Sequence, residues 1–172
     1  LLECASLVER IFFYGAGASS ADLKEIVRSG LQAVFSRAEI HVGHDLDAAA
    51  VASYNGVPHI ACILGTGSNS CFFDGKEIYE EVPALAYILG DEGGGSYYGK
   101  RLLADFFYKR MPAHLAEEFQ QKYNMSMNTM VQKVYTEPHA NVYLASLSKF
   151  CSEHKTEPYI QAMVRDGMRA FL

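Results

Sequence analysis

The first 54 residues alternate between short apolar runs and helical patterns, and this order restricts the fold more than any other feature of the chain. Residues 10–14 and 39–42 have the composition of short buried strands. Residues 22–35 and 45–54 repeat apolar or alanine side chains at helical spacing, and the serine pair at residues 19–20 offers an N-cap for the first helix. Because two strands joined by a helix pair in parallel, the sequence predicts an α/β fold.

After a break at Pro58 the pattern changes twice. Residues 71–79 are divided by the Asp-Gly dipeptide 74–75, which suits a two-residue turn, so this segment is predicted to form a hairpin. From about Tyr97 onward the apolar side chains recur at helical spacing. The expected helices span residues 97–110, 112–123, 127–135, 141–151 and 159–172.

The charge of the chain argues against two classes of partner. Fifteen basic and twenty acidic residues give a net charge of −5, and no basic stripe stands out along the chain. Binding of nucleic acid or of an anionic membrane surface therefore has no electrostatic support. No apolar run approaches the roughly 18 consecutive residues of a membrane span. We expect neither nucleic acid nor membrane as a partner.

The four cysteines are widely separated in the sequence. Cys4, Cys62, Cys71 and Cys151 include no Cys-x-x-Cys pair, which a metal or iron–sulfur site within this chain would favour. Cys62 lies in an apolar run and Cys71 begins another. We therefore predict buried free thiols and a cytoplasmic location, where thiols stay reduced.

A glycine-rich segment follows the apolar run 60–64. Its residues, Gly65-Thr66-Gly67-Ser68, place glycines at alternate positions beside two hydroxyl groups. Glycine lets backbone N–H groups approach a ligand closely, which is what an anionic phosphate tail requires. A glycine-rich hairpin without a ligand would have the same composition, so this segment alone leaves both interpretations open.

Acidic residues mark two further positions. Asp45 and Asp47 begin the alanine-rich helix directly after a strand, where ligands gather in α/β sheets, and Asp45 could accept a proton from a substrate hydroxyl. Helix capping is the alternative role for either side chain. Asp91 and Glu92 lie among four glycines in residues 90–95, where hydroxyl recognition or a water-mediated magnesium contact would explain them. An acidic turn that only caps the next helix competes with that explanation.

Four segments together resemble the family that groups N-acetylglucosamine kinases with the BadF/BadG/BcrA/BcrD-type ATPases, within the actin-like ATPase and sugar kinase superfamily. They are residues 12–17, 44–49, 63–69 and 87–93, in matching order and spacing, and the likeness is strongest to the bacterial N-acetylglucosamine kinases. The resemblance implies a ribonuclease-H-like, actin/hexokinase-type two-lobed α/β fold with a helical C-terminal part. It also implies ATP and Mg²⁺, a sugar substrate and a homodimer.

The resemblance assigns a role to each candidate residue. It makes Asp45 the catalytic base, which takes the proton of the sugar 6-hydroxyl as that oxygen attacks the γ-phosphate of ATP. It makes Asp47 and Glu92 supports of the site or of the magnesium ion, for which no direct protein ligand is implied. The sugar contacts that it implies are Gly17, Asn69 and Asp91. The second phosphate loop that it implies is Gly65, Thr66, Gly67 and Ser68.

The chain also departs from the family. Relatives begin with a first phosphate loop of the Asp-Gly-Gly-Gly-Thr kind and carry a later adenosine-binding segment, and neither is present here. We therefore expect an incomplete piece that is inactive alone, with the end of the first lobe in residues 1–57 and part of the second in residues 58–172.

Two other functions remain open on the same fold. One is an activator ATPase of the benzoyl-CoA reductase or 2-hydroxyacyl-CoA dehydratase type, which shares an iron–sulfur cluster between subunits; the dispersed cysteines offer no obvious ligand pair for it. The other is a sugar-binding relative without catalysis. Iron would identify the first, and sugar binding without turnover would identify the second.

Overall fold

The computed structural model describes residues 4–172, which divide into two compact units. The first unit contains residues up to 62 together with 70–82, and the second contains residues 63–69 and 83–172. The division falls within two neighbouring strands, β3 (His59–Leu64) and β4 (Ser68–Phe73). The lobe boundary predicted near residue 57 stays a prediction.

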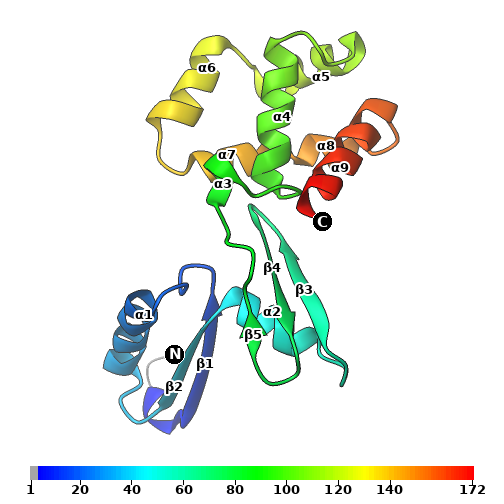
Figure 1. The fold of residues 1–172 in the computed structure, drawn as a ribbon. Coiled ribbons are helices and arrows are strands. Elements are labelled where there is room, and N and C mark those ends of the chain that lie inside the picture. The colour runs from blue at the N-terminus through cyan, green and yellow to red at the C-terminus, as the bar shows by residue number, and fades with distance from the viewer. Residues whose placement is uncertain (1–3) are drawn as a thin grey trace. The chain divides into compact units, whose positions relative to one another are not determined.

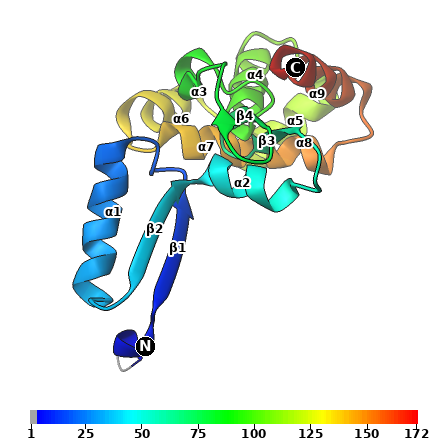
Figure 2. The same ribbon diagram turned by 60° about the horizontal axis from the view of Figure 1, so that its bottom comes forward.

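The first unit begins with the predicted strand–helix–strand–helix order. After a short 3₁₀ turn, Ala5–Leu7, it comprises β1 (Arg10–Gly15), α1 (Ala21–Val34), β2 (Glu39–His44) and α2 (Asp45–Ser53). Strands β1 and β2 pair in parallel, as predicted, and α1 lies alongside them (Figures 1 and 2). Their small core contains Ile40 and Val42 of β2, against which Val27 and Leu31 of α1 pack.

Local capping explains where α1 begins. The hydroxyl of Ser20 accepts a hydrogen bond from the Leu23 amide at 3.3 Å, which satisfies one of the unpaired donors of the first helical turn. The Arg28 guanidinium of the same helix donates to the Ile40 carbonyl of β2. Helix α1 is therefore tied to the small sheet by a polar contact as well as by its apolar face.

The hairpin is present, but its turn is longer than predicted. Strand β4 pairs antiparallel with β5 (Ile78–Tyr79), and Phe73 lies opposite Ile78, so four residues connect the strands instead of two. The carboxylate of Asp74 accepts from the amides of Lys76 and Glu77, each at 2.7 Å. This side-chain bonding builds a wider loop, because aspartate competes with the backbone for the turn donors. The prediction of a two-residue connection at residues 74–75 was therefore wrong.

Apart from the short helix at Ala86–Leu89, which was not predicted, the helical part of the second unit matches the sequence prediction with two changes. Its helices are α3 (Ala86–Leu89), α4 (Gly95–Phe107), α5 (Ala113–Tyr123), α6 (Met127–Val131), α7 (Ala140–Leu147), α8 (Lys149–Glu153) and α9 (Pro158–Phe171). The helix predicted over 127–135 continues from α6 as a π-helix, Gln132–Thr136. The helix predicted over 141–151 is interrupted at Ser148, whose amide and hydroxyl both bond the Ala145 carbonyl.

The second unit has the larger apolar core. Its fully buried side chains include Phe119 and Phe150, whose rings meet edge to face with centroids 5.2 Å apart. Helix α4 packs closely on α7 at Gly99, where a β-carbon would collide with the backbone of Leu144. A glycine is therefore required at this crossing, because the obstacle is backbone rather than a movable side chain.

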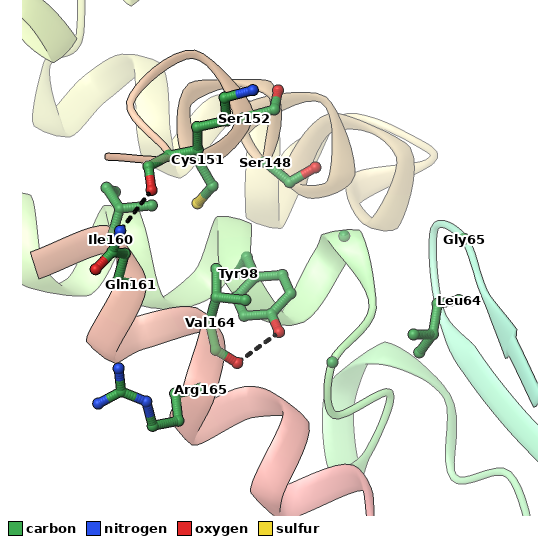
Figure 3. Close-up of a pocket in the computed structure, with 13 residues that line it drawn as sticks. Leu64, Gly65, Tyr98, Ser148, Cys151, Ser152, Ile160, Gln161, Val164 and Arg165 are labelled. Atoms are coloured by element: carbon green, nitrogen blue, oxygen red, sulfur yellow. Dashed lines mark hydrogen bonds between the residues drawn. The ribbon is translucent and has the colours of Figure 1, made fainter. Parts of the chain in front are cut away.

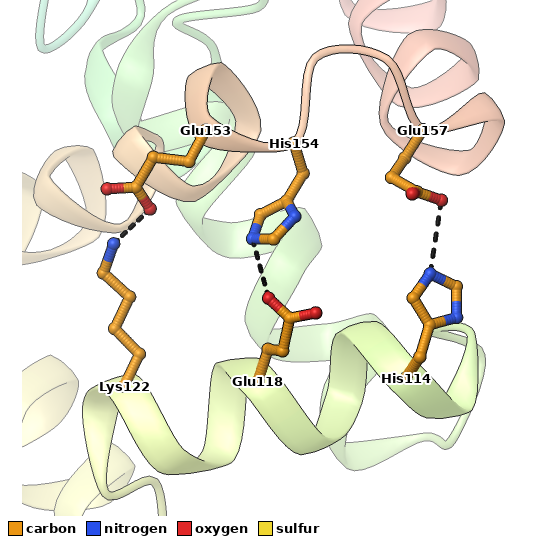
Figure 4. Close-up of polar contacts among 6 residues, drawn as sticks. All are labelled: His114, Glu118, Lys122, Glu153, His154 and Glu157. Carbon is orange, nitrogen blue, oxygen red and sulfur yellow. Dashed lines mark hydrogen bonds and ion pairs between the residues drawn. The ribbon is translucent and has the colours of Figure 1, made fainter.

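A row of charged pairs ties α5 to the segment that joins α8 and α9 (Figure 4). The pairs are His114–Glu157 at 3.2 Å, Glu118–His154 at 3.5 Å and Lys122–Glu153. The three α5 members are four residues apart and so share one helix face. The Lys122 ammonium lowers the pKa of the Glu153 carboxyl. Since most of these groups are at or near the surface, each pair adds little to stability.

Two of the predicted buried thiols are exposed. Cys71 and Cys151 are buried, and burial raises the pKa of the Cys151 thiol to about 11. Cys4 and Cys62 are exposed, so the prediction of burial was wrong for both. The apolar run around Cys62 belongs to a strand whose alternate side chains reach solvent.

Within residues 4–172, no helix combines the length and apolarity that a bilayer crossing requires.

Candidate functional site

Asp45 is the first residue of α2 and directly follows β2. Its Oδ1 accepts a hydrogen bond from the Leu46 amide at 2.9 Å and lies 3.1 Å from Nε2 of His44. The Asp45 side chain is 36% exposed, whereas that of His44 is 15% exposed. Both contacts engage the same carboxylate oxygen, and the partial exposure leaves the group accessible to a ligand.

Asp47 has the contacts of a helix cap. Its Oδ2 accepts from the backbone amide of His44 at 2.9 Å and lies 3.7 Å from the Lys24 ammonium of α1. The first contact satisfies a donor at the N-terminus of α2, and the carboxylate charge is favourable there. These contacts favour the capping role of Asp47 over a role in magnesium binding.

Gly17 lies in the turn between β1 and α1. The turn is closed by a hydrogen bond from the Ala18 amide to the Gly15 carbonyl at 3.0 Å. Gly17 is exposed, and a β-carbon added to it would meet no atom within 4 Å. The packing of the first unit therefore does not require glycine at this position. The predicted sugar contact of Gly17 stays a prediction.

The glycine loop of the second unit is fastened to the start of α4. The amides of Gly95 and Ser96 donate to the carbonyls of Gly65 and Thr66, each at 2.8 Å, and the Gly65 amide donates to Gly67 across the loop at 2.9 Å. The first amides of a helix are ordinarily unpaired and often bind anions. Here these two amides hold the loop instead, so they are not available to an anion.

The loop has donors available for that purpose. Within residues 4–172 no hydrogen bond uses the backbone N–H of Thr66 or Gly67, whereas that of Ser68 is engaged by Asp91. Thr66 is exposed and Gly67 is half buried. Two successive free N–H groups in a tight loop form the kind of concave site that binds anionic oxygens. The arrangement is therefore suited to a phosphate group.

Packing between the glycine loop and the start of α4 requires glycine at position 94 but not at position 65. A β-carbon at Gly94 would lie 2.6 to 2.9 Å from backbone atoms of Gly67, which is too close for any neighbour that cannot move. A β-carbon at Gly65 would meet no atom within 4 Å. Packing therefore explains Gly94, while the glycine at position 65 has no explanation within the protein.

Asp91 is placed against the same loop. Its Oδ1 accepts from the Ser68 amide at 3.3 Å, and its carboxylate carbon would lie 2.6 Å from a β-carbon at Gly67. Asp91 has a φ of 62°, a left-handed conformation that is uncommon outside glycine. Glu92 follows in the same turn and Asn69 lies in β4, and both are half buried. The structure thus joins Asp91 to the phosphate loop predicted from sequence.

A cavity of about 650 Å³ opens beside the glycine loop within the second unit (Figure 3). Leu64, Tyr98, Ile160 and Val164 give it apolar walls, and the Tyr98 hydroxyl donates to the Val164 carbonyl at 3.2 Å. The other lining residues are Gly65, Gly93, Gly95, Ser148, Cys151, Ser152, Lys155, Gln161 and Arg165. Two cationic side chains are therefore available beside a largely apolar surface.

Sequence reasoning missed several of these contributors. His44 contacts the candidate base, and its position next to Asp45 was a signal that could have been used. The amides of Gly95 and Ser96 and the cavity residues Lys155 and Arg165 gave no such signal. They lie far along the chain from the loop, and only the packed helices bring them to it.

The candidate residues fall into two groups. Gly17, Asp45 and Asp47 belong to the first unit; Gly65, Thr66, Gly67, Ser68, Asn69, Asp91 and Glu92 belong to the second. Within residues 4–172, no three histidine, cysteine, aspartate or glutamate side chains are arranged to hold a metal ion.

Comparison with known proteins finds a likeness among solved structures. No protein-family model matches the chain, and no curated protein matches it. Among solved structures, a crystal structure of the "putative N-acetylglucosamine kinase" from Porphyromonas gingivalis is 35% identical to it with a TM-score of 0.87. The alignment covers 96% of this chain and 58% of that protein. The chain thus has the mixed α/β fold of part of a protein described as a kinase, and spans less than two thirds of its length.

Proposed function

We propose that the complete protein is an ATP-dependent kinase that phosphorylates the 6-hydroxyl of N-acetylglucosamine. The observation that carries the proposal is the glycine loop. It is hydrogen-bonded to the start of α4, and the backbone N–H groups of Thr66 and Gly67 donate no hydrogen bond within residues 4–172. The likeness of the chain to a structure described as an N-acetylglucosamine kinase supports the choice of substrate. Because the chain covers only part of that relative, activity is proposed for the complete protein alone.

Asp45 is the proposed general base. A carboxylate that is partly exposed and follows a strand can reach a substrate hydroxyl, and it lowers the barrier by accepting the proton during transfer. The Leu46 amide and His44 both hold Oδ1, which orients the carboxylate. Gly17, Asn69 and Asp91 are the proposed sugar contacts, as the family resemblance implies.

The nucleotide is proposed to lie along the second unit. The amides of Thr66 and Gly67 would hold phosphate oxygens, with the hydroxyl of Ser68 nearby in the sequence. The neighbouring cavity of about 650 Å³ is within the range of small-molecule sites, and its apolar walls suit a nucleoside. ATP supplies the phosphoryl group that is transferred.

Magnesium fits this arrangement only as a partner of the nucleotide. The described residues hold no cluster of three acidic or histidine ligands, and Mg²⁺ in kinases is commonly held by phosphate oxygens, waters and one or two carboxylates. Glu92 is the proposed carboxylate, through water. The bound ion would neutralise the charge of the phosphate groups.

The remaining features of the proposal come from the resemblance. They are a ribonuclease-H-like, actin-type fold of two lobes, with residues 1–57 in the first lobe and 58–172 in the second. They also include a homodimer and a cytoplasmic location. Dimerisation is checked by light scattering on the complete protein, and a second protomer is expected.

The test is release of ADP by the complete protein with magnesium–ATP and a panel of hexoses and amino sugars. Turnover that requires N-acetylglucosamine is the expected result. Hydrolysis of ATP that ignores every sugar would overturn the proposal and favour an activator ATPase, whose iron would then be measured. Sugar binding without turnover would instead identify a non-catalytic relative.

A further inference from the structure

One short segment of the second unit contacts the glycine loop at successive points. The amides of Gly95 and Ser96 bond the carbonyls of Gly65 and Thr66, and Gly94 packs against the backbone of Gly67. All of these contacts use the backbone, so they depend on the conformation of the chain between residues 91 and 96. Asp91 stands at the start of that segment and is its side-chain contact to the loop.

The backbone at Asp91 is held in an uncommon conformation. Its φ of 62° lies in the left-handed region, which non-glycine residues adopt when the surrounding structure requires it. The Asp91 carbonyl accepts from the Gly94 amide at 2.9 Å, which closes a turn and delivers Gly94 to the loop. Asparagine and glycine both tolerate this conformation, so they can replace aspartate without new backbone strain.

The side chain of Asp91 then reaches the far end of the loop. Its Oδ1 accepts from the Ser68 amide at 3.3 Å, while the carboxylate covers the face of Gly67 where a side chain would otherwise project. A hydrogen bond from a backbone amide to a carboxylate is stronger than one between neutral groups. The contact fixes the residue that follows the two undonated amides of Thr66 and Gly67.

We infer that Asp91 is a positioning residue for the phosphate loop: its carboxylate holds Ser68 and so sets the direction of the Thr66 and Gly67 amides. The inference deepens the proposed function and rests on it for its kinetic consequence. The sugar contact proposed for Asp91 acts on the KM for sugar. Positioning of the loop acts in addition on the KM for ATP.

The test compares Asp91→Gly with Asp91→Asn in the complete protein. Both variants accept the left-handed backbone, but only asparagine keeps an oxygen that can accept from the Ser68 amide. Hydrogen exchange without ligand should be about tenfold faster at Ser68 in Asp91→Gly, the effect of losing one charge-assisted hydrogen bond. The increase should be smaller in Asp91→Asn, which keeps a neutral acceptor. The KM for ATP should rise about tenfold in Asp91→Gly and less in Asp91→Asn, whereas loss of the proposed sugar contact acts on the KM for sugar.

Two results would overturn the inference. One is an unchanged exchange rate at Ser68 in Asp91→Gly. The other is a KM for ATP in Asp91→Gly that stays within threefold of wild type, since the side chain would then serve the sugar alone. If Asp91→Gly does not fold, the hydrogen-exchange rates of the wild-type amides test the inference. It requires the Ser68 amide to exchange more slowly than those of Thr66 and Gly67, and equal rates would overturn it. The exchange result stands even if no sugar is phosphorylated, so the two proposals fail separately.

Discussion

The two candidate parts of the site are built in different ways. Asp45 in the first unit is held by its immediate neighbours, the Leu46 amide and the His44 ring. The glycine loop in the second unit is held by Asp91, Gly94, Gly95 and Ser96, which lie well over twenty residues further along the chain. A carboxylate at a helix start can thus form from local sequence, whereas the loop depends on the packing of the helical part.

This difference predicts where each part is fragile. The loop should be lost when backbone packing in the second unit is disturbed, even by one methyl group. Local polar contacts around Asp45 should tolerate comparable changes, because few distant atoms depend on them. Single replacements in the two units therefore test this contrast.

Gly99→Ala should be the most damaging of the glycine replacements. Its β-carbon would collide with the Leu144 backbone, where α4 and α7 meet, so we expect a loss of about 3 kcal/mol in the free energy of unfolding. The control is Gly30→Ala in α1, where the β-carbon meets no atom and alanine should stabilise by about 0.5–1 kcal/mol. Urea denaturation measures both. Equal changes in the free energy of unfolding in the two variants would contradict the expected difference in packing between the two units.

Gly94→Ala and Gly65→Ala separate a packing requirement from a ligand requirement. Gly94→Ala should cost about 1–3 kcal/mol, because the β-carbon would press on the Gly67 backbone. Gly65→Ala should leave stability within about 0.5 kcal/mol, since no atom lies within 4 Å of the new carbon.

Thermal unfolding and nucleotide titration of the complete protein measure this pair. If Gly65→Ala is stable but binds ATP at least tenfold more weakly, the ligand is what requires glycine there. If both stability and ATP affinity are unchanged, phosphate does not approach Gly65.

Two tyrosines of the helical part should respond oppositely to removal of the hydroxyl. Tyr159 donates to the buried carboxylate of Asp105 at 2.9 Å, so Tyr159→Phe should cost about 1–3 kcal/mol. The buried hydroxyl of Tyr123 has no partner within residues 4–172, so Tyr123→Phe should be neutral or slightly stabilising at pH 7. The free energy of unfolding at pH 7 measures the pair, and a larger loss in Tyr123→Phe would contradict it.

Alkaline pH should reveal the burial of Tyr123 directly. Desolvation raises its pKa to about 12 in the folded protein. The unfolded chain releases this proton near pH 10, so the folded state loses stability as the pH rises from about 10 towards 12. Tyr123→Phe should lose less stability than wild type over that interval. Parallel losses in the two proteins would contradict the assignment.

Of the variants expected to destabilise the protein, the Asp47 replacements should cost the least. Asp47→Ala removes the acceptor for the His44 amide and should cost about 1 kcal/mol, whereas Asp47→Asn keeps an acceptor and should cost less. Chemical denaturation of the complete protein measures the stability, and turnover is measured beside it. Retained turnover in Asp47→Asn is expected of a cap. A loss of turnover at intact stability would assign Asp47 to the site.

Local patterns in the sequence were enough for much of the first unit. The positions of β1 and β2, the serine cap of α1 and the parallel pairing of the two strands follow from spacing and capping chemistry. The predicted burial of β1 was wrong, because most of its side chains are exposed. The wider turn at Asp74 did not follow, because its side chain bonds two amides that the dipeptide pattern does not show.

The candidate site was predicted only as residues, without its supports. The composition of residues 65–68 indicated a phosphate loop but not what holds it. The contacts from Gly94, Gly95 and Asp91 depend on where the chain returns after an intervening hairpin. The cavity residues Lys155 and Arg165 depend on how α9 packs, which no local pattern specifies.

The most direct measurement is the turnover of Asp45→Asn in the complete protein, with magnesium–ATP and N-acetylglucosamine. Asparagine preserves the size of the side chain but cannot accept the hydroxyl proton. The account predicts a fall of about 10²- to 10⁴-fold in turnover, with the dissociation constant for the sugar within about tenfold of wild type. Turnover that stays within tenfold of wild type would show that Asp45 is not the base.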